Sequence, residues 1–175
     1  ATAANDPVKH HPTHLPPPAR TAAASAALSS FGAIVGITYG PIQCRFSEAL
    51  CVLPFFLPET AWGLGVGCLI ANLLSPYGVL DIVVGSAATL LAALLTARCQ
   101  KKWLAPLPPV IANTVLIGLV LAYEQAGTSA AFWPTYAFNA LTVGLGEAVA
   151  CYGLGGLLLW RLDKSNALQR YLQNR

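Results

Sequence analysis

The sequence predicts an all-α integral membrane protein: a bundle of six helices whose N- and C-termini both lie in the cytoplasm. Its composition, its long apolar segments and the placement of its basic residues lead to this class. Of the 175 residues, 55% are hydrophobic and only 10% are charged, and the mean hydropathy is +0.58. Soluble domains carry about 25% charged residues, so this chain lacks the charge to cover a globular surface. The composition therefore excludes an ordinary soluble enzyme, a nucleic-acid-binding protein and a disordered chain.

Apolar segments follow one another along residues 21–160, which form the predicted membrane domain. About 20 apolar residues cross the hydrocarbon core as one helix. Inside lipid every backbone polar group needs an internal partner, which leaves helices or a closed barrel. The segments lack the period-two alternation of strands, so we expect helices. The predicted spans are 21–39, 47–57, 61–74, 80–97, 106–123 and 134–160.

Basic residues decide whether the two short segments, 47–57 and 61–74, count as one span or two. With six spans, nine of the ten Lys and Arg residues fall on the cytoplasmic side, and only Arg45 lies outside. With five spans, the basic loop 98–102 and the basic C-terminus fall on opposite sides. Because cytoplasmic loops carry an excess of Lys and Arg, six spans are predicted. Segment 47–57 is short for an upright crossing, so we expect it to be longer than its apolar run or to span incompletely.

The two ends of the chain differ from the membrane domain. Residues 1–20 are polar and rich in proline, a composition that cannot bury apolar area, and we expect them to be disordered. Their His10, His11 and His14 can bind a metal, although a solvated tail is the simpler interpretation. Residues 161–175 are predicted to form a basic cytoplasmic tail.

Polar residues gather in the outer halves of the predicted spans, whereas the cytoplasmic halves hold almost none away from their ends. Glu147 lies near mid-membrane, where a carboxylate costs roughly 2.5–3.5 kcal/mol on insertion scales and usually serves a function. Asn113 lies at a similar depth, although an amide can also simply bond a neighbouring helix. This asymmetry predicts a binding site open to the outside. The polar candidates are Glu147, Asn113, Asn72, Asp81, Gln43, Arg45, Glu48 and Asn139.

Simpler roles also fit several of these candidates. Gln43, Arg45 and Glu48 are expected in the outer loop after the first span, and Arg45 and Glu48 are spaced to pair on one helical turn. Asp81 fits a solvated helix end as well as a site. The five cysteines are odd in number and mostly lie in or beside apolar runs, so buried apolar side chains are expected rather than metal or redox sites.

Small residues recur at four-residue spacing in the first span, as Ala22 with Ala26 and Ala23 with Ala27. This pattern lets helix backbones approach closely. The first span has more small residues than one internal interface needs, so we expect one face to meet another protein. Neither a G-x-x-x-x-G-K motif nor an H-E-x-x-H or G-x-S-x-G motif is present. We therefore expect no enzyme, no cofactor and no metal, and a transporter that needs a partner to drive it.

Five blocks in chain order resemble the QueT family of queuosine-precursor transporters. The blocks are Tyr39-Gly-Pro-Ile-Gln-Cys-Arg-Phe-Ser-Glu-Ala-Leu with Leu53-Pro-Phe-Phe, then 63–72, 81–93, 107–113 and 138–147. The resemblance runs from about Thr21 to Trp160. It implies an S component, the substrate-binding subunit of an energy-coupling-factor (ECF) transporter, in a bacterial cell membrane. It also implies a transmembrane coupling protein and two ATPase subunits as partners, with the first-span alanines meeting the coupling protein.

The substrate that the resemblance implies is a 7-deazaguanine. A guanine-like edge offers adjacent N–H donors that suit a carboxylate, and an aminomethyl group would add a cation, so Glu147 suits either role. Tyr39 is an outer-side aromatic residue that can stack on a flat ring. Another small aromatic, vitamin-like substrate stays open, and so does a small homo-oligomeric channel whose pore Glu147 and Asn113 would line. Besides a small molecule, the expected contacts are membrane lipid and no nucleic acid.

Overall fold

A computed structural model of the chain describes residues 15–35, 46–73 and 78–173. Every regular element in these ranges is helical, which confirms the predicted all-α class. In chain order the elements are α1 (Pro17–Val35), the 3₁₀-helix η1 (Phe46–Phe55), α2 (Thr60–Asn72), α3 (Gly78–Leu80), the π-helix η2 (Asp81–Gly85), α4 (Ser86–Ala97), the 3₁₀-helix η3 (Lys102–Leu104), α5 (Leu107–Ala126), α6 (Phe132–Ala148), the π-helix η4 (Val149–Gly155), α7 (Gly156–Asp163) and α8 (Asn166–Gln173).

Three helices of the described ranges are long and apolar enough to cross a membrane. Gly78–Ala97 joins α3, η2 and α4, Lys102–Ala126 joins η3 and α5, and Phe132–Asp163 joins α6, η4 and α7. The helix α2 is apolar but shorter. These helices agree with the last three predicted spans, while the six-span count and the side on which each terminus lies stay predictions.

The first two predicted spans differ most from the sequence expectation. The helix α1 begins at Pro17, so Arg20 is helical rather than part of the predicted tail. Proline is tolerated in the first turn of a helix, where its missing N–H has no partner to lose. The segment after it is η1, a ten-residue 3₁₀-helix with Pro54 inside it, and not a full span. This short element is consistent with the prediction that segment 47–57 spans the membrane incompletely.

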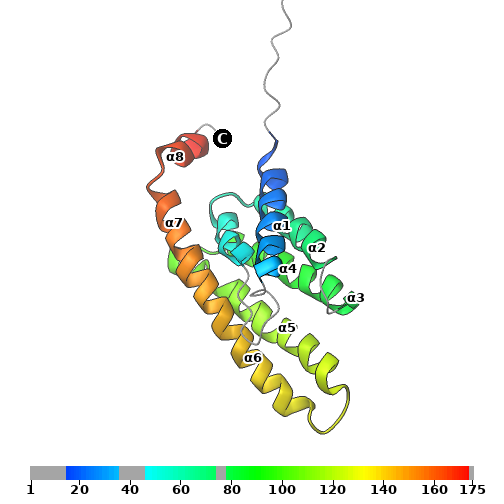
Figure 1. Ribbon diagram of the computed structural model, residues 1–175. Helices are drawn as coiled ribbons and strands as arrows, with labels where there is room; N and C mark the ends of the chain where they lie inside the picture. The colour runs from blue at the N-terminus through cyan, green and yellow to red at the C-terminus, as the bar shows by residue number, and fades with distance from the viewer. Residues whose placement is uncertain (1–14, 36–45, 74–77, 174–175) are drawn as a thin grey trace, which may run out of the picture.

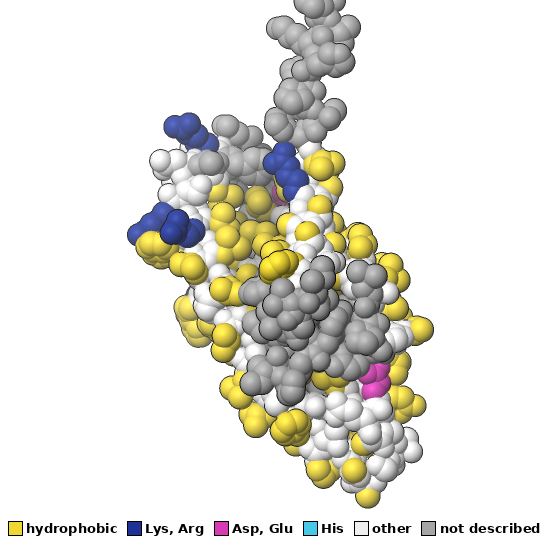
Figure 2. Space-filling model, in the orientation of Figure 1, with side chains coloured by type: hydrophobic (Ala, Val, Ile, Leu, Met, Phe, Trp, Pro, Cys, Tyr) yellow, Lys and Arg dark blue, Asp and Glu magenta, His cyan; other side chains and the backbone are white. Residues whose placement is uncertain are grey.

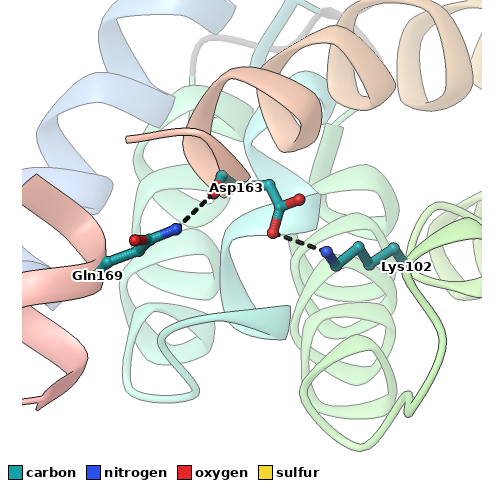
Figure 3. Close-up of polar contacts among 3 residues, drawn as sticks. All are labelled: Lys102, Asp163 and Gln169. Atoms are coloured by element: carbon teal, nitrogen blue, oxygen red, sulfur yellow. Dashed lines mark hydrogen bonds and ion pairs between the residues drawn. The ribbon is translucent and has the colours of Figure 1, made fainter. Parts of the chain in front are cut away.

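The predicted C-terminal tail is mostly helical over the residues that the structure describes. The helix α7 continues to Asp163, and α8 follows after a short turn. Lys102 Nζ lies 2.7 Å from Asp163 Oδ1, and Gln169 Nε2 donates to the Asp163 carbonyl at 3.1 Å (Figure 3). Asp163 thus connects η3, α7 and α8.

The described N-terminal end of α1 and the α7–α8 end of the chain lie toward the same end of the molecule, and the α5–α6 turn lies at the other (Figure 1). On the face shown in Figure 2, the Lys and Arg side chains lie toward the end shared by α1 and α7–α8, and hydrophobic side chains are spread over the coloured part between the two ends. Trp62, Leu141 and Val149 are among many large apolar side chains that are mostly exposed. An apolar exterior of this extent is typical of a surface that meets lipid.

Small residues bring the helices close together. A Cβ added at Gly63 would collide with the Pro18 carbonyl of α1, and one at Gly67 would lie 2.7 Å from Ser25 Cβ. Between α5 and α6, a Cβ at Gly144 would lie 2.8 Å from Thr114 Oγ1. Glycine at these positions allows the close backbone approach that membrane helices use for packing. The α5–α6 pairing positions the candidate site.

Candidate functional site

Glu147 of α6 and Asn113 of α5 meet inside the bundle. Both are at most 5% exposed, and Asn113 Nδ2 donates a 2.9 Å hydrogen bond to Glu147 Oε1. Burying a charged group is costly unless it is paired or hydrogen-bonded, so this amide offsets part of the cost of the carboxylate. The two residues were expected at similar depth, and the structure brings them into direct contact.

A second carboxylate reaches the same place from η1. Glu48 is 3% exposed. Three atoms lie within 4.8 Å of one another: one carboxylate oxygen of Glu48, one of Glu147, and Cys151 Sγ. This corrects the expectation that Glu48 lies in an outer loop. The reason is tertiary packing: η1 lies against η4, where a Cβ at Gly155 would be 3.1 Å from Val52.

Two cysteines bond these carboxylates. Cys51 Sγ lies 2.9 Å from Glu48 Oε2, and Cys151 Sγ lies 3.6 Å from Glu147 Oε2, with each thiol as the donor. Both cysteines are buried, as expected, but they also donate hydrogen bonds and do not serve only as apolar side chains. Sequence reasoning missed them as site residues, although spacings of three and four residues from the acids would have placed each pair on one helical face. We call Glu48, Glu147, Asn113, Cys51 and Cys151 the carboxylate–thiol cluster.

The helix that carries Glu147 changes its winding two residues later. The π-helix η4 begins at Val149 and includes Cys151. A second π-helix, η2, begins at Asp81. Such bulges inside α-helices are frequently found at functional sites, because the extra residue turns side chains toward positions that regular winding does not reach. Within the described residues, each of these two π-helices begins at or near a buried acidic residue.

Asn72 and Asp81 form a separate group between α2 and η2. Both are 2% exposed, so the structure excludes solvated helix ends for them. Asn72 Nδ2 donates to the Asp81 backbone carbonyl at 3.1 Å and to Cys68 Sγ at 3.5 Å. Thr89 Oγ1 donates to the same sulfur at 3.2 Å. We call Asn72, Asp81, Cys68 and Thr89 the Asn72–Asp81 cluster.

The helix α5 links the two clusters. Ile117, one turn after Asn113, lies beside Gly85, where an added Cβ would be 3.7 Å from its Cδ1. The same Cβ would lie 2.7 Å from Asn72 Nδ2 and 3.2 Å from Asp81 Oδ1. Gly85 therefore stands at the contact between η2 and α5 with no room for a side chain.

The other predicted site residues lie elsewhere or outside the described ranges. Asn139 is buried, and its Nδ2 donates a 3.2 Å hydrogen bond to Gln125 Oε1 near the α5–α6 turn. Tyr39, Gln43 and Arg45 lie outside the described residues, so their place in a site stays a prediction.

The expected partner face on α1 separates into two halves. Ala23 and Ala27 are exposed, while Ala22 and Ala26 are half-buried. The buried side of α1 consists of hydroxyl residues that face the rest of the bundle, namely Thr21, Ser25 and Ser29. Ser29 Oγ donates to Ser47 Oγ of η1 at 2.7 Å. An apolar, small-residue face is thus left on the outside of α1.

Comparison with known proteins gives a consistent picture. Residues 19–164 match the family described as QueT transporter. The queuosine precursor transporter QueT of Lactococcus lactis subsp. cremoris (strain MG1363) is 38% identical over 71 residues. That match covers 38% of this chain and 41% of the relative, so it spans less than half of either protein. No solved structure matches the chain.

Proposed function

Because this chain belongs to the QueT transporter family, we propose that it is a multi-pass subunit of a bacterial cell membrane that binds a queuosine precursor of the 7-deazaguanine class for uptake. The relative's printed name supports the precursor as substrate. Family membership and the three long apolar helices support transport across a membrane as the task. Neither implies a chemical reaction, so we infer no catalytic role.

The observation that carries the proposal is the convergence of Glu48, Glu147 and Asn113 within the carboxylate–thiol cluster. A 7-deazaguanine ring offers adjacent N–H donors on its guanine edge, and a carboxylate accepts two such donors. An aminomethyl substituent adds a positive charge, for which a second carboxylate is the natural partner. The Asn113 amide offers both a donor and an acceptor for the remaining edge. We propose that Glu147 and Asn113 hold the ring edge and that Glu48 pairs with the cation.

Equilibrium binding to the purified full chain tests this proposal. We expect a 7-deazaguanine that carries an aminomethyl group to bind, and Glu147→Gln to weaken its binding roughly 10- to 100-fold. The reason is the loss of a charge-assisted hydrogen bond, which contributes about 1.5–3 kcal/mol. Glu59→Gln, in the turn before α2, is the matched control and should bind normally. Equal affinity of wild type and Glu147→Gln would remove Glu147 from the site.

We further propose that the chain is an S component with six crossings and both termini in the cytoplasm, and that it works with a transmembrane coupling protein and two ATPases. The common end of α1 and α7–α8, where Lys and Arg gather, supports this orientation (Figures 1 and 2). The exposed Ala23 and Ala27 support a close helix contact with the coupling protein. Ala22 and Ala26, which are half-buried, border the same face.

A bulky side chain on this face tests the coupling proposal. Ala27→Trp should abolish uptake by the reconstituted complex, because it blocks close helix approach. Precursor binding to the isolated subunit should be unchanged, because Ala27 points away from the bundle that holds the carboxylate–thiol cluster. Leu141→Trp, on an exposed position of α6, is a control for bulk alone. Normal uptake by Ala27→Trp would exclude this docking face.

A further inference from the structure

We propose that the carboxylate–thiol cluster also binds a thiophilic divalent cation such as Zn²⁺, through Glu48, Glu147 and Cys151, and that the bound ion excludes the precursor. Only the exclusion rests on the function proposed above; metal binding does not depend on it. The sequence alone predicted no metal site, because Glu48 lies 103 residues before Cys151 in the chain, while Glu147 and Cys151 are four residues apart on one helix. The fold is what brings them together.

The geometry is close to that of a three-ligand site. The donor atoms of Glu48, Glu147 and Cys151 all lie within 4.8 Å of one another, and each residue is at most 5% exposed. Around a tetrahedral Zn²⁺, with Zn–S of about 2.3 Å and Zn–O of about 2.0–2.2 Å, donors are about 3.3–3.7 Å apart. Side-chain rotations that bring the donors about 1 Å closer would complete the coordination. Three protein ligands leave the fourth position for water, as in open zinc sites.

The donor types select the metal. A thiolate is a soft ligand that favours Zn²⁺ and related ions, whereas Mg²⁺ and Ca²⁺ prefer sites made wholly of oxygen. On binding, the Cys151 S–H bond breaks, its proton passes to water, and a metal–sulfur bond forms. Two carboxylates and one thiolate then balance the ion to a net charge of −1. The cationic group of the precursor would bind the same carboxylates, so the metal ion and the precursor compete for them.

Neighbouring groups hold two of the ligands in position. Asn113 Nδ2 bonds Glu147 Oε1, which directs the other oxygen, Oε2, toward Cys151 Sγ at 3.6 Å. The Cys51 thiol lies 2.9 Å from Glu48 Oε2 and orients that carboxylate from the next turn. Hydrogen bonds of this kind typically fix the orientation of ligating side chains in metal sites. The thiol of Cys51 thus acts as a positioning group, whereas Cys151 supplies the ligand.

Co²⁺ is a suitable probe, because a cobalt–thiolate bond gives a charge-transfer absorption that histidine or carboxylate ligands do not. We expect this band when Co²⁺ is added to the reduced, purified full chain, and we expect Zn²⁺ to remove it by displacement. Cys151→Ser should lose the band. Cys68→Ser, which changes a buried cysteine of the Asn72–Asp81 cluster, is the matched control and should keep it. A wild-type protein without the band, or a Cys151→Ser protein with an equal one, would overturn the proposal.

Glu48→Gln provides a test that does not depend on the cysteine variant folding well. It keeps the side-chain volume, and we expect it to weaken Co²⁺ binding about tenfold or more when the band is titrated; an unchanged midpoint contradicts a role for Glu48. Precursor binding is then measured with and without saturating Zn²⁺. A large loss of affinity is expected, and equal affinities would disprove the exclusion. If the band forms but no precursor binds, the proposed function fails and the metal site stands; the reverse outcome rejects the metal site alone.

Discussion

The carboxylate–thiol cluster and the Asn72–Asp81 cluster are both buried polar groups inside apolar helices, but their partners differ. In the first, most hydrogen bonds join two side chains, as between Asn113 and Glu147, although Cys151 Sγ also lies 3.8 Å from the Glu48 backbone carbonyl. In the second, Asn72 bonds the backbone carbonyl of Asp81, and Cys68 lies 3.8 Å from that of Gly85. Most buried side-chain hydrogen bonds go to the backbone, and bonds between side chains are a minority. The partners of a buried polar group therefore help to separate structural roles from functional ones.

This difference predicts a division of roles. Groups that bond the backbone fix one helix against another, so changing them should lower the free energy of unfolding. Asn113 and Glu147 bond each other through their side chains, and such groups can exchange partners for a ligand without disturbing the backbone. We therefore expect changes in the Asn72–Asp81 cluster to reduce stability, and changes in the carboxylate–thiol cluster to reduce binding.

Within the comparison of these two clusters, the largest effect on stability is expected at Gly85. A Cβ there would lie 2.7 Å from Asn72 Nδ2 and 3.2 Å from Asp81 Oδ1. Gly85→Ala should lower the free energy of unfolding by about 1–3 kcal/mol, as overpacking in a tight interior does. Thermal or denaturant unfolding of the purified protein in detergent measures the change.

Gly153→Ala is the matched control, because it also lies in a π-helix but an added Cβ meets nothing within 4 Å. It should be neutral or stabilise the protein by about 0.5–1 kcal/mol, the usual advantage of alanine over glycine in a helix. If the two variants behave alike, η2 and α2 are not tightly packed. That result would contradict a structural role for the Asn72–Asp81 cluster.

Much of the fold is predictable from the sequence, because apolar length is a direct requirement of the lipid. The predicted span 106–123 corresponds to α5 at Leu107–Ala126, and 134–160 corresponds to the helix Phe132–Asp163. The ends differ by a few residues, since polar residues such as Glu124 and Asp163 continue a helix once its backbone bonds are in place. The helix α8 was not predicted, because the basic residues of 161–175 suggested a tail, although local helix formation does not need a buried face along its whole length.

The candidate site was predictable only in part. Glu147 and Asn113 stand out because polar side chains in long apolar runs are costly. Glu48 precedes a short apolar run, where a loop is the simpler prediction, and only the contact between η1 and η4 reveals its burial. The cysteines are ambiguous in any sequence, because the same residue serves as an apolar filler and as a ligand. Convergence of these residues depends on long-range packing, which the local patterns of a single sequence do not reveal.

Smaller effects, on stability in one cluster and on affinity in the other, are expected from removing one amide in each cluster. Asn72→Ala should lower the free energy of unfolding by about 0.5–1.5 kcal/mol, because the Asp81 carbonyl loses its donor. Precursor affinity should change little. Asn113→Ala should lower affinity roughly tenfold, because Glu147 loses the group that orients it, while its effect on unfolding should be smaller than that of Asn72→Ala. Measuring the free energy of unfolding and the precursor affinity of both variants tests whether the two clusters have different roles. If Asn72→Ala weakens binding as much as Asn113→Ala, then both clusters line one site, as the sequence first suggested, and backbone partners do not distinguish structural from functional polar groups in this fold.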